Sequence, residues 1–207
     1  MIQPFHGGVL GQEPPSTWVP HGCRVLDNVV AAPESLFAQL RDEITWTTHM
    51  RSRGTASMGV PYNYSGASYP KMPWHPAVAT LADHVAKVLG FQPTNCLLNL
   101  YPTGQSRVRW HADDTTILAD GTGIGIVSLG ATRSMGLRCQ TPTGFHYEDL
   151  VLTSGSLLIM SSEMQQHWRH AIRRCETPHA RISLSFRHIV RWPDAPPLVP
   201  DRRSSTD

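Results

Sequence analysis

Apolar residues recur with helical spacing in two stretches of the N-terminal half of the chain. Over residues 35–46, four apolar side chains share one helical face: Leu36, Phe37, Leu40 and Ile44. Over residues 76–89 the same spacing recurs, and Gly90 follows at a position typical of a helix end. These patterns predict two amphipathic helices, each with one face against a core.

Short apolar stretches separated by turn residues dominate the rest of the chain. They predict strands over these ranges: 95–101, 107–111, 124–129, 135–139, 147–152, 155–160 and 180–189. The polar segment 47–74 is rich in tyrosine and favours further strands joined by exposed loops. Helices followed by many short strands indicate an α+β fold whose β part is a sandwich or a barrel.

Composition is consistent with one folded domain. The chain has 207 residues and a mass of 23.0 kDa, with 40% hydrophobic and 16% charged residues. This balance argues against a coiled coil and against a wholly disordered chain. We expect a lead-in over residues 1–20, a folded domain over 21–191, and a Pro-rich, then polar, tail over 192–207.

Charge and cysteine content narrow the class of protein. The formal net charge is +2, so charge alone does not indicate a strongly basic nucleic-acid binder. The four cysteines are far apart in sequence, which argues against a disulfide framework or a zinc knuckle and favours a reducing compartment. Residues 1–10 do not resemble a signal peptide, and no stretch approaches the roughly 20 apolar residues of a membrane span. We therefore expect a cytoplasmic protein with no membrane partner.

His111-Ala112-Asp113 is the first candidate for a site with chemistry. In an extended segment residues i and i+2 point to the same side, so both side chains can reach one metal ion. A third ligand would complete a two-His-one-carboxylate site, which suits Fe(II) and leaves coordination positions open. Three histidines are candidates for this ligand: His167, His170 and His179. The alternative for each of them is an ordinary surface or core histidine.

The segment ARISLSFR alternates between polar and apolar residues. As a strand it places Arg181, Ser183 and Arg187 on one face and the apolar side chains on the other. Two inward guanidinium groups are costly unless they meet an anion, and a small dicarboxylate would satisfy them with paired hydrogen bonds. Asn99 and Tyr101 share one face in the same way and could contact the same ligand. A solvated strand face is the alternative.

Six motifs occur in order along the chain: NLY at 99–101, HAD at 111–113, SLGATR at 128–133, GSLLIM at 155–160, HWRHAI at 167–172 and RISLSFR at 181–187. Together they resemble the AlkB-like family of Fe(II)- and 2-oxoglutarate-dependent dioxygenases, close to its DNA-repair members, over roughly residues 20–190. The resemblance implies a double-stranded β-helix, or jelly roll, with flanking helices on one side. Residues 21–191 would then be an AlkB-like dioxygenase domain.

The resemblance implies an iron site. His111, Asp113 and His170 would bind Fe(II), because His170 is followed by a small and then an aliphatic residue, as in the family. With O2 and 2-oxoglutarate as co-substrates, the site would hydroxylate a C–H bond. On an N-methyl group of a base in DNA or RNA, hydroxylation would release formaldehyde, and this oxidative demethylation is the function that the resemblance favours.

The resemblance also assigns residues to the co-substrate. Arg181 would bind the distal carboxylate of 2-oxoglutarate, and Arg187 would assist near the end that chelates iron. Asn99, Tyr101 and Ser183 would supply hydrogen bonds, although the AlkB pattern often has Asn where Ser183 stands.

Residues 49–74 would form a lid over the substrate. Its aromatic and cationic side chains could stack a flipped base and contact phosphates: Arg51, Arg53, Met58, Tyr62, Tyr64 and Tyr69. The alternative is that the tyrosines pack the lid onto the barrel. Trp110 adjoins a metal ligand but, by strand parity, faces away from it.

Thr115 departs from the family pattern. Repair members usually have an acidic residue at this position, two residues after the metal aspartate, where it can contact the damaged base. Asp114 is adjacent but should point elsewhere. A neutral pocket favours an alternative in which the same chemistry hydroxylates a small-molecule metabolite or an amino-acid side chain of a protein. A third hypothesis is a non-enzymatic binding module, but the complete set of metal ligands and arginines argues against it. The sequence leaves the oligomeric partner unknown.

Overall fold

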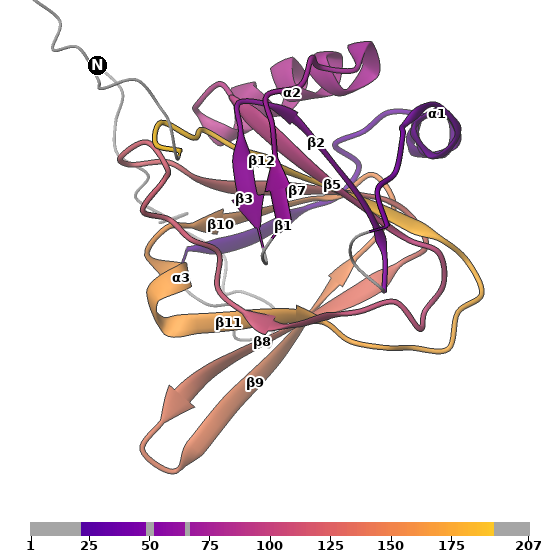
Figure 1. The fold of residues 1–207 in the computed structure, drawn as a ribbon. Coiled ribbons are helices and arrows are strands. Elements are labelled where there is room, and N and C mark those ends of the chain that lie inside the picture. The colour runs from indigo at the N-terminus through magenta and orange to yellow at the C-terminus, as the bar shows by residue number, and fades with distance from the viewer. Residues whose placement is uncertain (1–21, 49–51, 65–66, 193–207) are drawn as a thin grey trace, which may run out of the picture.

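A computed structural model describes residues 22–48, 52–64 and 67–192 of the chain (Figure 1). A six-stranded antiparallel sheet has the spatial order β1 (Cys23–Leu26), β10 (Leu157–Ser161), β7 (Gly123–Gly130), β12 (Arg181–Arg187), β5 (Asn95–Tyr101) and β2 (Gly54–Gly59). A four-stranded sheet faces it, in the order β6 (Val108–His111), β11 (Trp168–Ile172), β8 (Arg133–Thr141) and β9 (Gly144–Leu152). A separate pair is formed by β3 (Tyr62–Tyr64) and β4 (Ala67–Tyr69). The predicted α+β jelly roll is confirmed, while the predicted lead-in and most of the predicted tail lie outside the described residues.

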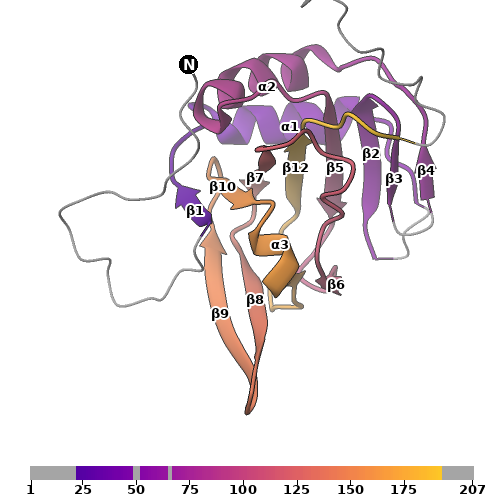
Figure 2. The ribbon, with the colours of Figure 1, turned by 90° about the vertical axis from the view of Figure 1, so that its left-hand side faces the viewer.

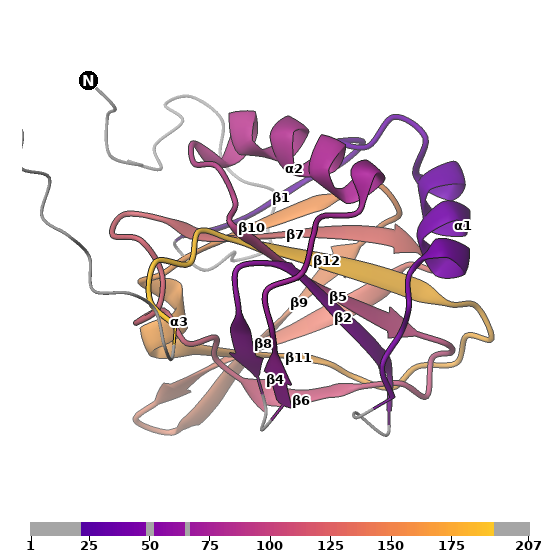
Figure 3. The same cartoon turned by 45° about the horizontal axis from the view of Figure 1, so that its top comes forward.

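Both predicted helices cover the outer face of the six-stranded sheet (Figure 3). Leu40 of α1 (Pro33–Glu43) and Val78 and Val85 of α2 (Pro76–Leu89) enter a buried cluster with side chains of β5, β7, β10 and β12. α2 has the predicted bounds and ends at Gly90, whose φ of 76° suits glycine. α3 (Met164–His167) is a single turn between β10 and β11. Within the described ranges, none of the helices combines the length and apolar character that a membrane span requires.

The end of α1 differs from the prediction. The helix ends at Glu43 rather than at residue 46, because Ile44 is extended, with φ −81° and ψ 131°. Thr47 then exchanges two backbone hydrogen bonds with Thr55 of β2, at 2.8 and 2.9 Å. Pairing with the sheet therefore overrides the helical spacing of the last residues.

β12 lies in the middle of the six-stranded sheet, between β7 and β5. Ile182, Leu184 and Phe186 pack into the cluster beneath the helices. The alternate side chains face the four-stranded sheet, where Arg181 and Arg187 are 1% and 3% exposed. The predicted alternation is confirmed, and both faces of β12 are buried, so the solvated-face alternative is excluded.

The apolar pattern does not predict β11. Arg169 and His170 interrupt this short segment and hide its alternation. In the structure Trp168, His170 and Ile172 face the interior, and β11 pairs with β6 on one side and β8 on the other. The strand that carries His170 is therefore recognised only from the structure.

The β8–β9 hairpin extends beyond the body of the domain (Figure 2). On its outer face the guanidinium carbon of Arg138 lies 4.8 Å from the ring centroid of Trp110 and 4.7 Å from that of Phe145. Trp110 therefore packs on the outside of the four-stranded sheet, as strand parity predicts.

Candidate metal centre and anion pocket

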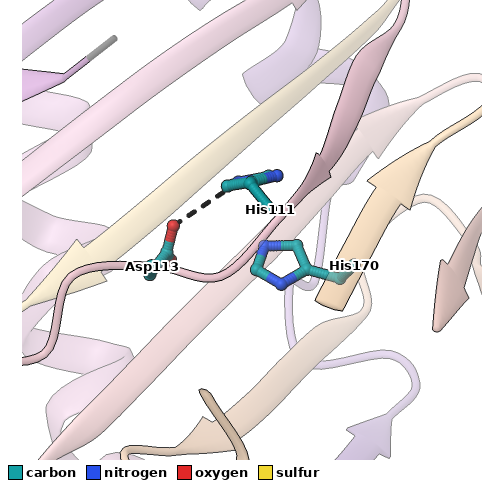
Figure 4. A group of neighbouring side chains, drawn as sticks. All are labelled: His111, Asp113 and His170. Atoms are coloured by element: carbon teal, nitrogen blue, oxygen red, sulfur yellow. Dashed lines mark ion pairs between the residues drawn. The ribbon is translucent and has the colours of Figure 1, made fainter. Parts of the chain in front are cut away.

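Two neighbouring strands bring His111, Asp113 and His170 together. His111 ends β6 and lies directly opposite His170 of β11, and Asp113 follows two residues later. One possible ligand atom from each side chain lies within 4.8 Å of the others, and His111 Nε2 is 3.6 Å from Asp113 Oδ1 (Figure 4). Two imidazoles and one carboxylate form the donor set that suits Fe(II) with open coordination positions.

The structure separates the three histidines that the sequence offers as a third ligand. His170 is 4% exposed and belongs to the cluster. His167, at the end of α3, and His179, just ahead of β12, are both exposed. Strand pairing, which brings His170 opposite His111, makes this distinction.

Both imidazoles are prepared to offer a nitrogen lone pair. His111 Nδ1 lies 2.9 Å from the Arg109 carbonyl oxygen, so in the neutral ring Nδ1–H donates there and Nε2 carries the lone pair. Burial lowers the pKa of His170 to about 4, which keeps this ring neutral near pH 7. A metal ion binds the lone pair of a neutral imidazole, so the hydrogen bond of His111 Nδ1 and the uncharged ring of His170 favour metal binding.

Asp113 is held as a carboxylate. Burial opposes its charge, but the Arg187 guanidinium, together with His111 and His170, outweighs that effect and holds the pKa of Asp113 well below its usual range. Arg187 Nη2 donates to Asp113 Oδ2 at 2.9 Å, while Oδ1 faces His111. The Asp113 backbone N–H donates to Gln165 Oε1 at 3.0 Å. Sequence reasoning missed Gln165, because a buried glutamine in a one-turn helix gives no periodic signal.

Arg181 is a buried cation with hydrogen-bonding capacity left over. Its Nη2 donates to Ser128 Oγ at 2.8 Å, and its guanidinium carbon lies 5.2 Å from the ring centroid of Tyr101. Its Nε and Nη1 are buried and have no hydrogen-bond partner among the described residues. Burial lowers the pKa of Arg181, which is the mark of a charge without full compensation. Ser128, in the SLGATR motif, was not among the predicted site residues.

One cavity between the sheets joins the metal ligands to this arginine. It is lined by both groups, including His111, Asp113, His170, Arg181, Ser183 and Arg187. Asn99 and Tyr101 also line it, directly opposite Ser183 and Arg181 in the pairing of β5 with β12. Because buried N–H groups of Arg181 lack an acceptor among the described residues, an anion such as a carboxylate is the partner that fits best. The residues therefore fit a metal ion and a carboxylate ligand side by side.

Met58 requires a correction. Its side chain packs into the cluster beneath the helices, and its sulfur accepts the His75 backbone N–H, so it does not face the cavity. Strand parity is the reason: Thr55 and Ser57 of β2 face the interior, so Met58 faces the helices. The prediction that Met58 contacts the substrate is wrong.

The other lid residues have mixed positions. Arg53 is 8% exposed, and its Nε donates to Asn99 Oδ1 at 2.7 Å. Tyr62 is buried, with its ring centroid 5.0 Å from the guanidinium carbon of Arg187. Tyr69 is buried as well and donates to Thr55 Oγ1 at 2.8 Å. These contacts favour the alternative in which tyrosines pack the lid onto the barrel; Arg51 and the side chain of Tyr64 lie outside the described residues.

The loop after Asp113 contains Thr115 and Asp114. Thr115 is half-buried, while Asp114 is exposed. Asp114 Oδ1 accepts hydrogen bonds from the backbone N–H and the hydroxyl of Thr116, at 2.9 and 2.6 Å. As predicted, the carboxylate is occupied with its own loop and turned from the cavity, so it does not replace the acid absent at Thr115.

Comparison with known proteins identifies a family and several relatives that this chain resembles. The sequence model of the 2OG-Fe(II) oxygenase superfamily matches residues 16–187. The alpha-ketoglutarate-dependent dioxygenase alkB homolog 3 of Bos taurus is 31% identical over 180 residues, which cover 78% of this chain and 62% of that protein. The DNA oxidative demethylase ALKBH2 of Bos taurus is 33% identical over 153 residues, which cover 70% and 55%. The chain thus spans between 55% and 62% of the length of these two relatives.

A solved structure, that of OsALKBH1, has the same fold. It superposes with a TM-score of 0.53 at 18% identity, over 83% of this chain and 100% of that one. The superfamily description names iron(II) and 2-oxoglutarate, a metal ion and a dicarboxylate, which are the two kinds of ligand that the cavity fits. Since one family model covers most of the chain and the double-stranded β-helix agrees with it, the chain belongs to the 2OG-Fe(II) oxygenase superfamily, among the AlkB homologues.

Proposed function

We propose that this chain is a dioxygenase that hydroxylates N-alkyl groups of bases in DNA or RNA and so removes them, with Fe(II), 2-oxoglutarate and O2. The observation that carries the proposal is a single cavity that contains both the His111–Asp113–His170 cluster and buried N–H groups of Arg181 for which the described part of the chain offers no acceptor. A non-catalytic binding module would not need a set of metal-binding side chains beside an anion pocket.

The metal-binding cluster and the two buried arginines have distinct roles in this proposal. His111, Asp113 and His170 would hold the iron, and Arg187 would keep Asp113 ionised and oriented through its hydrogen bond to Oδ2. Arg181 would bind the distal carboxylate of 2-oxoglutarate with N–H groups that have no partner among the described residues. When bound, iron and 2-oxoglutarate supply an oxidant derived from O2 for a C–H bond.

The polar lining would orient the co-substrate. Asn99, Tyr101 and Ser183 lie on the same cavity wall as Arg181, and all four are buried. Buried donors on a rigid sheet hold an anion in one orientation without reorganising, which favours reaction over release. The same burial excludes bulk water from the oxidising centre.

The relatives support a nucleic-acid substrate. Those from Bos taurus, Homo sapiens and Mus musculus named DNA oxidative demethylase ALKBH2 are 32% to 33% identical to this chain over at least 153 residues. A base lesion in a buried cavity requires a flipped nucleotide.

Thr115 supports a second candidate function. The position that would present an acid to a damaged base is neutral, and Asp114 is held by Thr116. The same iron chemistry would then act on a small-molecule metabolite or on a side chain of a protein. This alternative keeps every assignment to iron and 2-oxoglutarate and changes only the substrate.

A turnover assay tests the proposal. The purified chain would receive Fe(II), 2-oxoglutarate, ascorbate and air, with an oligonucleotide that contains N1-methyladenine or N3-methylcytosine. We expect the oligonucleotide to lose the mass of one methylene group, with stoichiometric succinate and formaldehyde, and an Asp113→Ala variant to produce none. Succinate without a change in the oligonucleotide would transfer support to the second candidate, and absence of succinate with every substrate would refute dioxygenase activity.

A further inference from the structure

Arg53 donates a hydrogen bond to Asn99, one of the residues that line the cavity. It lies one residue ahead of β2, which neighbours β5 in the six-stranded sheet (Figure 1). Thr55 lies directly opposite Asn99 in this pairing, so Arg53 is its diagonal neighbour on the same face. The distance of 2.7 Å between Arg53 Nε and Asn99 Oδ1 marks a short, charge-assisted hydrogen bond between two buried side chains.

This hydrogen bond determines which end of the Asn99 amide faces Arg53. A guanidinium group has donors only, whereas an amide has one acceptor oxygen and one NH2 group. With Oδ1 toward Arg53 the contact is favourable; with the amide flipped, two donors would face each other in a buried site. Arg53 therefore favours the orientation that leaves the NH2 group of Asn99 for other partners.

The cavity shows what such a partner would be. Asn99 lines it beside Ser183, its direct partner on β12, and Arg181 follows one position further along the same face. All three can donate hydrogen bonds toward one ligand, and a wall of donors suits an anion. A flipped Asn99 would instead place an acceptor oxygen against that anion and repel it.

We infer that Arg53 is a positioning residue for 2-oxoglutarate: it fixes the Asn99 amide so that Nδ2 is presented to the co-substrate. The inference rests on the proposed function and revises the earlier expectation that Arg53 contacts the substrate. It also connects β2, which leads into the β3–β4 pair, to the anion pocket.

Two substitutions separate hydrogen bonding from charge. In Arg53→Gln, Nε2 stands at the same number of bonds from Cα as the Nε of arginine, so the donor remains while the charge is lost. In Arg53→Met both are lost with similar side-chain length. We expect Arg53→Met to weaken 2-oxoglutarate binding about tenfold, the effect of one hydrogen bond, and Arg53→Gln to stay within about threefold of the wild type. Calorimetry on Mn(II)-loaded protein without O2 measures this without turnover.

A double-mutant cycle tests whether Arg53 acts through Asn99. Asn99→Ala should weaken 2-oxoglutarate binding about tenfold, and Arg53→Met combined with Asn99→Ala should be no weaker than Asn99→Ala alone. Losses that multiply would overturn the inference, because Arg53 would then act on the ligand by itself. Arg41→Met is the control, since Arg41 is exposed and paired with Asp42, and it should bind like the wild type.

The outcomes distinguish this inference from the proposed function. Wild-type protein that does not bind 2-oxoglutarate refutes the proposed function, whereas equal binding by wild type and Arg53→Met refutes only the role of Arg53. Loss of binding in Arg53→Gln as large as in Arg53→Met would assign the effect to charge and also overturn the inference. If Arg53→Met does not fold, the side-chain NH2 signal of Asn99 in 15N-labelled wild type decides: it should shift when 2-oxoglutarate is added, and an unchanged signal would contradict the orientation.

Discussion

Replacing Arg181 by Met should remove most of the affinity for 2-oxoglutarate without unfolding the protein. Two buried N–H groups of Arg181 have no partner in the described structure. A charge-assisted hydrogen bond contributes about 1.5–3 kcal/mol. Two such bonds to the ligand therefore amount to about 3–6 kcal/mol, and their loss weakens binding by a factor of about one hundred to twenty thousand.

The stability of the ligand-free protein should not fall when Arg181 is replaced by Met. Arg181 is 1% exposed, and its lowered pKa shows that burial of its charge is unfavourable. Met fills much of the same volume without that charge, so Arg181→Met should be as stable as the wild type or more stable when no ligand is present. Arg181→Lys keeps the charge but not the paired geometry, and its affinity should fall between the two.

Thermal unfolding with and without 2-oxoglutarate checks both statements in one experiment on Mn(II)-loaded protein. At a concentration one hundred times the wild-type Kd, the ligand should stabilise the wild type by about 2.7 kcal/mol, and Arg181→Met by close to zero. For a domain of this size the wild-type Tm should rise by about 5–10 °C. Equal ligand-induced shifts in the two proteins would refute the role of Arg181, and a large loss of Tm without ligand would show that its role is structural.

Four further predictions concern other residues. Asp113→Ala should lose bound iron, measured by elemental analysis after desalting, because it removes the only anionic member of the His111–Asp113–His170 cluster; iron retained at wild-type stoichiometry would contradict the metal assignment. Met58→Ala should lower the free energy of unfolding by about 2–4 kcal/mol in urea titrations, because a buried side chain leaves a cavity, but should leave the Kd for 2-oxoglutarate unchanged. Burial raises the pKa of the Cys23 thiol to about 12, so at pH 8 Ellman's reagent should modify exposed Cys175 quickly and Cys23 only after unfolding. The unfolded chain releases this proton from about pH 9 while the folded chain keeps it, so stability should fall as pH rises from about 9 to about 12, and flat urea midpoints over that range would contradict the pKa.

Local patterns predicted which way side chains face wherever an element has a clear period. The alternation in ARISLSFR predicted that Arg181 and Arg187 share the buried polar face of β12, and the structure confirms it. The helix over 76–89 was predicted with its bounds because proline and glycine mark its ends. Strand parity also predicted that Trp110 faces away from the cavity.

Pairing between distant segments could not be predicted from local patterns. The choice of His170 among three histidines follows from the register of β11 against β6, which no short window of sequence contains. Met58 was misplaced because an exposed lid was expected where the chain forms β2, whose parity turns that side chain toward the helices. Gln165 and Ser128 were missed because each acts through one hydrogen bond, and single polar residues have no periodic signature.

The position of β12 has a consequence for how the protein folds. β12 is the last strand in the sequence, but it occupies the middle of the six-stranded sheet. Its residues 181–187 pair with residues 95–101 on one side and 124–130 on the other. Until it is inserted, β5 and β7 expose unpaired backbone edges, which favour aggregation. Such non-local pairing places folding in the slow range, about milliseconds to seconds. Because Arg181 and Arg187 lie on this strand, the anion pocket is complete only when the strand has paired, and a chain interrupted before residue 181 would have neither the pocket nor a closed sheet.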